Sequence, residues 1–178
     1  MDKFFNPQSI VIIGLSAKQS NIARLVLENL LRWGYCGRIF GLNPTSEDRH
    51  VTGIRIYQKM EDLPEMPDLA ACFTPARFVP GYLEACGKFG IKRVAIPSGG
   101  FAELSEDGKK LSDSLIDIAR KYDLRFMGPN GLMTANTTNG LCIPFLPLFR
   151  PPSGRLSLIS QSGGLGLMLW HLMTNENV

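Results

Sequence analysis

Small polar residues and glycines are concentrated in five short segments whose chemistry suits the binding of an anion. The first segment, GLSAKQSN, stands between an apolar run and a helical pattern, and it carries the ammonium group of Lys18 and the polar side chains of Ser16, Gln19 and Ser20. A loop that leads into a helix also presents backbone N–H groups and the positive end of the helix dipole, and both suit a phosphate. The other four segments are LNPTS, TPAR, PSGG and GPNG.

Each of these segments has a simpler explanation when it is taken alone. Serine and asparagine before a helix are common N-caps, which stabilise a helix by about 1 kcal/mol without any ligand. All five segments, however, are predicted to follow the carboxyl ends of strands in one sheet, where ligands of such folds bind. Their combination therefore favours a binding site, to which the segments contribute Gly14, Thr74, Pro75 and Asn130 as candidate contacts.

The segments are positioned by a regular alternation of apolar runs and helical patterns. The predicted strands lie within residues 9–14, 37–44, 67–75, 92–100 and 124–131, with a further short strand possible at 53–57. Helical spacing of apolar residues covers 21–33, 78–90 and 111–122. The apolar runs are continuous, which is typical of a parallel sheet covered on both faces. The sequence therefore predicts an α/β, Rossmann-like doubly wound domain over residues 1–130.

The character of the sequence changes after residue 130. Residues 131–154 are rich in Asn, Thr and Pro and are predicted to form an extended linker, whereas 155–178 repeat the order of strand, glycine-rich turn and helix. One βα unit cannot bury both faces of its strand, so 155–178 is interpreted as an incomplete second domain. Either the chain is a fragment, or this segment packs on the first domain or on a partner. Trp33 and Trp170 are predicted to be packing residues on helices.

The composition excludes several classes of function. Of 178 residues, 19 are basic and 16 acidic, and the net charge of +3 without a basic block does not suggest a nucleic-acid-binding protein. The four cysteines lie far apart, so neither a metal site nor a disulfide framework is predicted. The chain has no apolar run of membrane-spanning length and no signal-peptide pattern at its N-terminus. We therefore expect a soluble, cytoplasmic protein that does not bind membranes.

The first loop differs from an ordinary dinucleotide fingerprint. NAD-binding domains usually carry an acidic residue at the end of their second strand, where this chain has Leu42, Asn43 and Pro44. The loop after Gly14 also lacks the second glycine that lets a pyrophosphate approach the backbone. Both departures argue against a NAD(P)-binding protein, which remains the least favoured alternative, and favour another nucleotide-bearing cofactor.

Six stretches, spread over the whole chain, occur in a specific order. They are FNPQSIVIIGLSAKQSNIARLVLENLL, GRIFGLNP, DLAACFTPA, VPGYLEACGKFGIKRVAIPSGGFAE, RFMGPNG and RLSLISQSGGLG. Together they resemble the NDP-forming (ADP-forming) acyl-CoA synthetases, a family similar to the succinyl-CoA synthetase α subunit. The resemblance implies a Rossmann-like CoA-binding domain over 1–130, a linker over 131–154, and the first βα unit of a flavodoxin-like ligase domain over 155–178.

The resemblance also implies roles for individual residues. Ser16, Ala17, Lys18 and Gln19 match the loop that holds CoA, and Ser46, with Asn43 and Pro44, lies where the family places residues beside the nucleotide end. The turn that lies along the pantetheine arm is matched by Ser98, Gly99 and Gly100. The loop and helix N-terminus that face the transferred phosphoryl group are matched by Ser160, Gln161, Ser162 and Gly163. Glu103 is expected to stabilise a helix N-terminus rather than to contact the ligand.

Some positions depart from the family pattern. Leu15 stands where an alanine is common, Ala23 where a glycine usually begins the helix, and Gly131 and Met133 replace the usual Cys or Ser and Gly. Neither of the chain's two histidines, His50 and His171, matches the phosphohistidine of the family, and the ATP-grasp part is absent. We therefore expect no catalytic residue and no metal site in this chain.

The leading interpretation is the CoA-binding portion of an ADP-forming acyl-CoA synthetase. Its ligand would be CoA or an acyl-CoA and its partner an ATP-grasp domain or subunit, while ATP or ADP and Mg²⁺ would act only in the complete enzyme. The alternative is a stand-alone CoA-binding regulatory module without catalysis.

Overall fold

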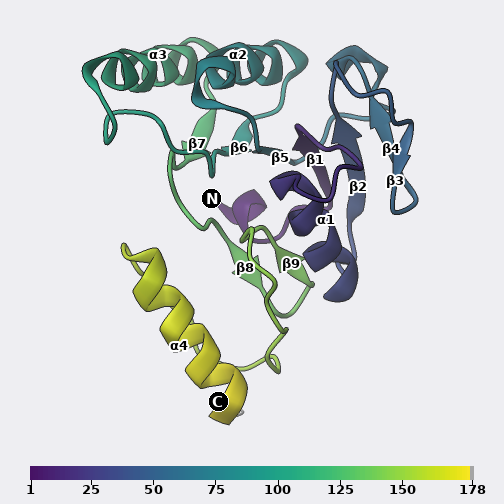
Figure 1. The fold of residues 1–178 in the computed structure, drawn as a ribbon, viewed down its shortest axis with the longest axis vertical. Coiled ribbons are helices and arrows are strands. Elements are labelled where there is room, and N and C mark those ends of the chain that lie inside the picture. The colour runs from purple at the N-terminus through teal and green to yellow at the C-terminus, as the bar shows by residue number, and fades with distance from the viewer. Residues whose placement is uncertain (177–178) are drawn as a thin grey trace.

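The fold is organised around one mostly parallel sheet, seen in a computed structural model that describes residues 1–176. The strands are β1 (Ser9–Ile13), β2 (Arg38–Leu42), β3 (His50–Val51), β4 (Ile54–Tyr57), β5 (Leu69–Cys72), β6 (Arg93–Ala95) and β7 (Arg125–Met127). Their order is β3-β4-β2-β1-β5-β6-β7, and only β3 runs antiparallel to its neighbour (Figure 1). Without β3, the parallel strands numbered along the chain follow the order 3-2-1-4-5-6 of dinucleotide-binding folds. The predicted Rossmann-like fold class is confirmed.

Three helices connect the parallel strands, and several of their ends carry residues suited to that place. They are α1 (Ile22–Arg32), α2 (Val79–Phe89) and α3 (Glu106–Tyr122), with short 3-10 turns at Asp2–Phe4, Met60–Asp62 and Ala76–Phe78. The side chains of Asn21 and Ser105 accept the N–H groups of Arg24 and Gly108 and so cap the N-termini of α1 and α3. Gly90 ends α2 in the left-handed conformation, at φ +101°. The predicted helices are confirmed.

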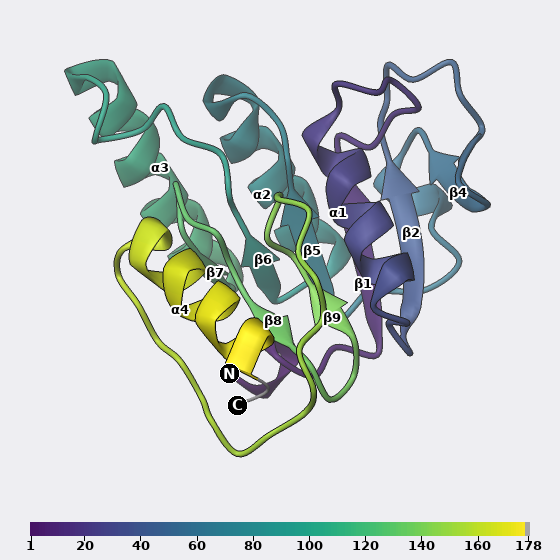
Figure 2. The same cartoon turned by 60° about the horizontal axis from the view of Figure 1, so that its bottom comes forward.

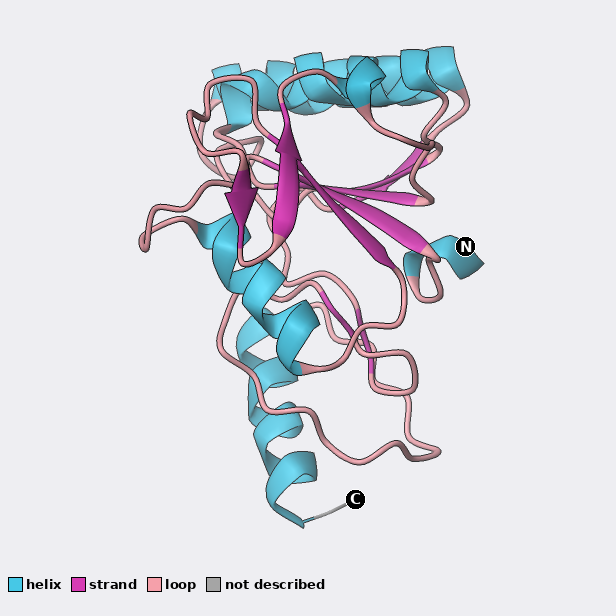
Figure 3. Ribbon diagram, turned by 90° about the vertical axis from the view of Figure 1, so that its right-hand side faces the viewer, coloured by secondary structure: helices cyan, strands magenta, loops and turns pink. Residues whose placement is uncertain are grey.

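The two faces of the sheet carry separate hydrophobic clusters. Alternate residues of β1 point to opposite faces, so that Val11 and Ile13 pack with α2 and α3, whereas Ile10 and Ile12 pack with α1. Figure 3 shows the layer formed by α2 and α3 on one side of the sheet and the remaining helices on the other. Burial on both faces explains why the strands read as continuous apolar runs.

The prediction of an extended linker over 131–154 is wrong for most of that segment. Residues 134–148 form a small hairpin, β8 (Ala135–Asn136) and β9 (Leu141–Cys142), and return along α1. Leu141, Cys142 and Ile143 are fully buried on the α1 side of the sheet. The side-chain amide of Asn29 in α1 donates to the carbonyl oxygens of Pro144 and Leu146, at 2.9 and 2.7 Å. A short apolar run within the polar segment therefore completes the core of the first domain.

The strand predicted at the start of 155–178 is also absent, whereas the helix is present. Residues 155–160 adopt no regular structure and are exposed; Ile159 is 98% exposed. A strand without a neighbouring strand leaves its backbone groups unpaired, so β-forming residues alone do not make one here. Helix α4 (Gly163–Glu176) lies on the side of the sheet that carries β8 and β9 (Figure 2). The ring of Trp170 in α4 stacks on the ring of Trp33 at the end of α1, with 5.3 Å between their centres, as expected for packing residues.

Candidate functional site

The candidate site lies where β1 and β5 end side by side. The chain passes from β1 to β2 on one side of this point and from β5 to β6 on the other, and ligands of such folds bind at a switch point of this kind. Gly14 follows β1 at φ +90°, and its N–H donates to the Leu42 carbonyl oxygen of β2 at 2.8 Å. A Cβ atom at this position would lie 2.7 Å from the Phe73 carbonyl oxygen and 3.2 Å from Thr74 Cγ2. Glycine is therefore required for the close approach of the first loop to the end of β5.

The first loop leaves several backbone donors free at the N-terminus of α1. The Asn21 side chain holds both ends of the loop, since its Nδ2 donates to the Gly14 carbonyl oxygen at 3.0 Å and its Oδ1 accepts the Ser16 N–H at 3.3 Å. Within residues 1–176, the N–H groups of Lys18, Gln19 and Ser20 take part in no hydrogen bond. All three of these residues are exposed. The loop therefore combines a fixed frame with amides that are available to an anion.

The segment after β2 lies directly beside this loop. Asn43 Nδ2 donates to the Leu15 carbonyl oxygen at 3.0 Å, while Asn43 Oδ1 accepts the Thr45 N–H at 3.1 Å. Ser46 is buried, and its hydroxyl oxygen accepts the N–H of Asp48 at 3.2 Å. Pro44 is exposed at the tip. Of the three predicted residues here, Asn43 and Ser46 shape the backbone, and Pro44 faces outward.

Two residues that the sequence interpretation missed also contact the first loop. Asp48 Oδ2 accepts the Ala17 N–H at 3.0 Å, and the Arg24 guanidinium donates to the Ala17 carbonyl oxygen at 2.5 Å. Arg24 also pairs with Glu28 at 2.9 Å. The spacing of four residues between Arg24 and Glu28 is a sequence signal for that helical pair. Nothing in the local sequence around Asp48 indicates its contact with Ala17.

The ends of β5, β6 and β7 form the other half of the site. The Ser98 hydroxyl donates to the Cys72 carbonyl oxygen at 3.4 Å, and the Asn130 N–H donates to the Ser98 carbonyl oxygen at 3.0 Å. Thr74 is buried, with its hydroxyl 3.3 Å from Cys72 Sγ. Burial raises the pKa of the Cys72 thiol to about 11, so this group stays protonated at neutral pH. These contacts join the Thr74, Ser98 and Asn130 segments, and exposed Pro75 lies next to them.

A carboxylate organises the glycine turn after β6. Glu103 Oε1 accepts the N–H groups of Gly100 and Phe101, at 2.7 and 3.1 Å. The hydrogen bond from Gly100 lowers the pKa of Glu103 below its usual value. A Cβ atom on Gly99 would lie 3.3 Å from both Asn130 Oδ1 and Glu103 Oε1. The expectation that Glu103 stabilises a helix N-terminus is therefore wrong, since Ser105 caps α3 and Glu103 holds the turn.

The predicted phosphate-binding residues lie at the N-terminus of α4. Ser162 Oγ accepts the Leu165 N–H at 3.3 Å, and the Ser160 hydroxyl donates to the Ser162 carbonyl oxygen at 2.9 Å. A Cβ atom on Gly163 would lie 3.1 Å from Leu132, two residues beyond Asn130. Ser160, Gln161, Ser162 and Gly163 are all exposed. This group therefore lies beside the turn after β7, and its hydrogen bonds within the described chain stay inside residues 160–166.

Two departures from the family pattern have a structural explanation. Leu15 and Ala23 are completely buried in the cluster on the α1 side of the sheet. The methyl group of Ala23 therefore fills core space below the loop and does not narrow the loop itself. The histidines lie elsewhere: His50 is exposed in the edge strand β3, and His171 is exposed on α4.

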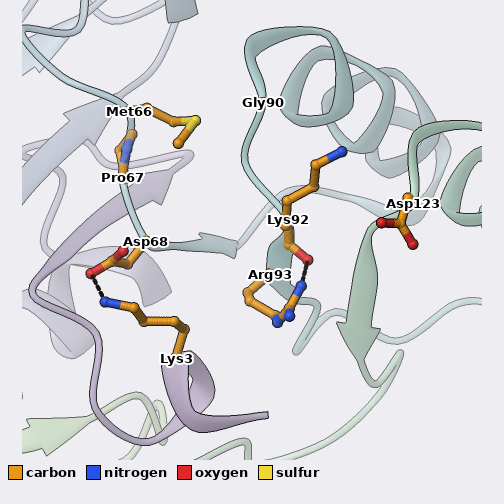
Figure 4. A pocket seen from close by; sticks show the side chains of 8 residues that line it. All are labelled: Lys3, Met66, Pro67, Asp68, Gly90, Lys92, Arg93 and Asp123. Carbon is orange, nitrogen blue, oxygen red and sulfur yellow. Dashed lines mark hydrogen bonds and ion pairs between the residues drawn. The ribbon is translucent and has the colours of Figure 1, made fainter.

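A cavity of about 280 Å³ lies at the opposite, amino-terminal edge of the sheet (Figure 4). Its charged residues are Lys3, Asp68, Lys92, Arg93 and Asp123, which stand at or before the starts of β5, β6 and β7 or near the N-terminus. Lys3 pairs with Asp68 at 2.9 Å, Lys92 donates to the Tyr122 carbonyl oxygen at 2.5 Å, and Arg93 donates to that of Lys92 at 2.8 Å. Lys3, Lys92 and Arg93 thus already donate hydrogen bonds to oxygen atoms of the protein. None of the predicted site residues lines the cavity.

Known proteins share both the sequence pattern and the fold. Residues 8–137 match the family model described as CoA binding domain. The acetate–CoA ligase [ADP-forming] I subunit alpha of Pyrococcus furiosus is 40% identical over 171 residues, covering 95% of this chain and 37% of the relative.

Two solved structures are also similar over nearly the whole chain. The crystal structure of PH0766 from Pyrococcus horikoshii OT3 has a TM-score of 0.90 at 34% identity and covers 99% of this chain. The dinucleotide forming acetyl-coenzyme A synthetase 1 of Ca. Korarchaeum cryptofilum, in complex with phosphate and ADP, has a TM-score of 0.84 at 32% identity and covers 98%. The chain spans 40% and 37% of these two proteins, so it is similar to less than half of each. Among residues 1–176, no helix has the length and apolar character needed to cross a membrane.

Proposed function

Because this chain belongs to the CoA binding domain family, we propose that it binds coenzyme A at the carboxyl edge of its sheet. The observation that carries the proposal is the first loop, where the N–H groups of Lys18, Gln19 and Ser20 have no partner among residues 1–176 and precede the N-terminus of α1. Free amides at a helix N-terminus bind phosphate through hydrogen bonds and the helix dipole. Coenzyme A carries its phosphates at the nucleotide end, which fits such a loop.

Each group of candidate residues is assigned to one part of the ligand. Ser16, Ala17, Lys18 and Gln19 would hold the phosphates, while Asn43, Pro44 and Ser46 would lie along the nucleotide. The turn of Ser98, Gly99 and Gly100 would follow the pantetheine arm. Gly14, Thr74, Pro75 and Asn130 would line the floor between these two halves. The hydrogen bonds that join the Thr74, Ser98 and Asn130 segments support one continuous surface there.

For the complete protein, we propose an ADP-forming acyl-CoA synthetase, which converts acyl-CoA, ADP and phosphate to a carboxylate, CoA and ATP. The similarity to the ADP-forming ligase subunit of Pyrococcus furiosus supports this assignment. Ser160, Gln161, Ser162 and Gly163 would face the transferred phosphoryl group, since a helix N-terminus stabilises phosphate without acting as a nucleophile. An ATP-grasp partner would supply ATP or ADP and Mg²⁺. The chain alone is expected to form no acyl-CoA.

One observation favours the alternative of a self-sufficient CoA-binding module. Helix α4 packs on the first domain through the Trp33–Trp170 stack, and Trp170 Nε1 donates to the Phe149 carbonyl oxygen at 3.1 Å. Hydrogen exchange tests this point, because strong protection across residues 163–173 supports a stable module, whereas rapid exchange there supports dependence on further parts. The cytoplasmic location stays a prediction.

Calorimetric titration with CoA and with NADH under identical conditions tests the binding proposal. We expect heat from CoA and none from NADH. Binding of NADH without binding of CoA would contradict the proposal. A coupled assay with the isolated chain tests the second expectation, since sustained acyl-CoA formation would show that catalytic groups are present in it.

A further inference from the structure

A carboxylate of the protein occupies one amide of the loop that is proposed to hold phosphate. Asp48 lies six residues beyond the end of β2, and the chain brings it back so that its Oδ2 accepts the Ala17 N–H at 3.0 Å. The same oxygen lies 3.5 Å from the Ser46 hydroxyl, and the Ser46 oxygen accepts the Asp48 N–H. The hydrogen bond to Ser46 thus holds the backbone of Asp48, and the hydrogen bond from Ala17 holds its carboxylate against the loop.

The position of this carboxylate matters because the neighbouring amides are free. The N–H groups of Lys18, Gln19 and Ser20 follow directly after Ala17 and have no partner among residues 1–176. A carboxylate that accepts a backbone N–H is an anion with the same hydrogen-bonding role as a phosphoryl oxygen. Two anions cannot share the Ala17 N–H, and their mutual repulsion disfavours holding both at this loop.

We infer that Asp48 is an internal anion on the first loop, and that a phosphoryl oxygen of the ligand displaces it. The inference rests on the proposed function, since it concerns how the same loop accepts CoA. It follows that Asp48 weakens the binding of phosphorylated ligands and sets how strongly affinity depends on their charge. In the free protein, the same contact keeps the loop in one conformation.

A second role for Asp48 predicts the opposite sign. In dinucleotide-binding proteins an acidic residue near the end of the second strand accepts the ribose hydroxyls, and Asp48 is an acidic residue that follows β2 by six residues. If Asp48 accepted hydrogen bonds from the ribose hydroxyls, its removal would weaken binding. The direction of the change in affinity therefore separates a displaced anion from a ribose ligand.

The test compares the wild-type protein with Asp48→Asn and with the matched control Glu47→Gln. The introduced asparagine keeps a side-chain oxygen that can accept the Ala17 N–H, but it carries no charge. Glu47 is exposed and makes no hydrogen bond or ion pair among the described residues, so its variant removes the same charge one residue away. Calorimetry at low ionic strength measures binding of CoA and of pantetheine.

We expect Asp48→Asn to bind CoA about three- to tenfold more tightly, because one repulsive charge is removed beside the phosphates. The control variant should stay within about twofold of the wild type, because the high dielectric constant of water weakens the interaction of an exposed charge with the ligand. Pantetheine, which has no phosphate, should bind both proteins equally. An Asp48→Ala variant with an unchanged melting profile should show the same direction for CoA as Asp48→Asn.

Unchanged or weaker binding of CoA by Asp48→Asn would overturn the inference while the wild type still bound CoA. An equal gain with pantetheine would also overturn it, because the effect would then not depend on phosphate. If neither the wild type nor the variant bound CoA, the proposed function itself would fail.

Discussion

The two edges of the central sheet differ in what they offer a ligand. At the carboxyl edge, the loops after β1, β2, β5, β6 and β7 carry small residues, and the N–H groups of Lys18, Gln19 and Ser20 remain free within residues 1–176. The amino-terminal edge has the cavity of about 280 Å³, and each of its cations donates at least one hydrogen bond to a protein oxygen, although the buried Nε of Arg93 has no partner among the described residues. The difference between the edges lies in their free donors, and it is the reason for proposing the anion site at the carboxyl edge rather than at the cavity.

The direction of the helices explains this difference. The N-terminus of α1 lies at the carboxyl edge of the parallel sheet, and it adds partial positive charge and unpaired donors there. Helices α2 and α3 end at Gly90 and Asp123, which line the cavity at the other edge. Helix C-termini attract cations, and the Lys92 ammonium group accordingly donates to the Tyr122 carbonyl oxygen at the end of α3.

The largest expected effect is the loss of stability when a glycine at either edge is replaced by alanine. Gly14→Ala should lower the free energy of unfolding by about 2–4 kcal/mol, because positive φ disfavours a side chain and the new Cβ would meet the backbone oxygen of Phe73. Gly90→Ala has the same φ penalty, but its Cβ would meet Met66 Sδ, which can turn away. We expect a cost of about 1–2 kcal/mol for Gly90→Ala. Urea unfolding of both variants measures the two changes in the free energy of unfolding. Equal changes would show that the backbone at Gly14 accommodates a Cβ atom as easily as the side chain of Met66 does at Gly90.

A smaller effect is expected from charge reversal at either edge. Lys18→Glu should weaken CoA binding about tenfold at low ionic strength, equivalent to about 1.4 kcal/mol, because a negative charge replaces a cation beside the phosphates. Lys92→Glu, at the cavity, should change CoA affinity by less than about twofold, because Lys92 lies at the opposite edge of the sheet from the proposed site and the Coulomb energy falls with distance. Calorimetric titration of both variants checks the prediction. A larger loss for Lys92→Glu would move the site to the amino-terminal edge.

The smallest expected effect is the salt dependence of one carboxylate at each edge. The hydrogen bond from the Gly100 amide lowers the pKa of Glu103. For Asp68, burial alone would raise the pKa, but the hydrogen bonds from the Gln8 amide and from Lys3 outweigh burial, and the pKa is lowered. In both cases the folded pKa lies below the unfolded one. Each group therefore stabilises the fold above its ordinary pKa, and this contribution is lost as the pH falls through the lowered value.

Carboxyl NMR titrations at low and high salt measure the two pKa values. Salt should move the pKa of Asp68 back toward its ordinary value, because the Lys3 ion pair is screened. The pKa of Glu103 should move less, because its partners are neutral amides at short range. An equal salt response would show that long-range charge controls both edges.

Much of the fold could be predicted from the sequence because local signals agreed with the tertiary structure. The run at Ser9–Ile13 and the helix that begins after Asn21 follow from continuous apolar residues and an N-cap. The strand expected at 155–160 failed because β-forming residues do not supply a neighbouring strand. Composition also misled at 134–148, where three consecutive apolar residues bury against α1 although Asn, Thr and Pro surround them.

The candidate site was predicted as a set of loops but not as a set of contacts. The first loop and the glycine turn follow from residue type and position after a strand. Asp48 could not be found in this way, because its contact with Ala17 depends on how the segment between β2 and β3 folds back. Similarly, the bonds of Glu103 to the glycine turn depend on a loop that precedes α3 rather than on the helix itself.

Amide hydrogen exchange of the wild-type chain during titration with CoA tests most directly whether the carboxyl edge is the binding edge. Bound CoA should slow exchange at Ala17, Lys18, Gln19 and Ser20 and at Gly99 and Gly100, and it should leave Asp68, Arg93 and Asp123 unchanged. Slowed exchange around the amino-terminal cavity, with no change in the first loop, would contradict the account.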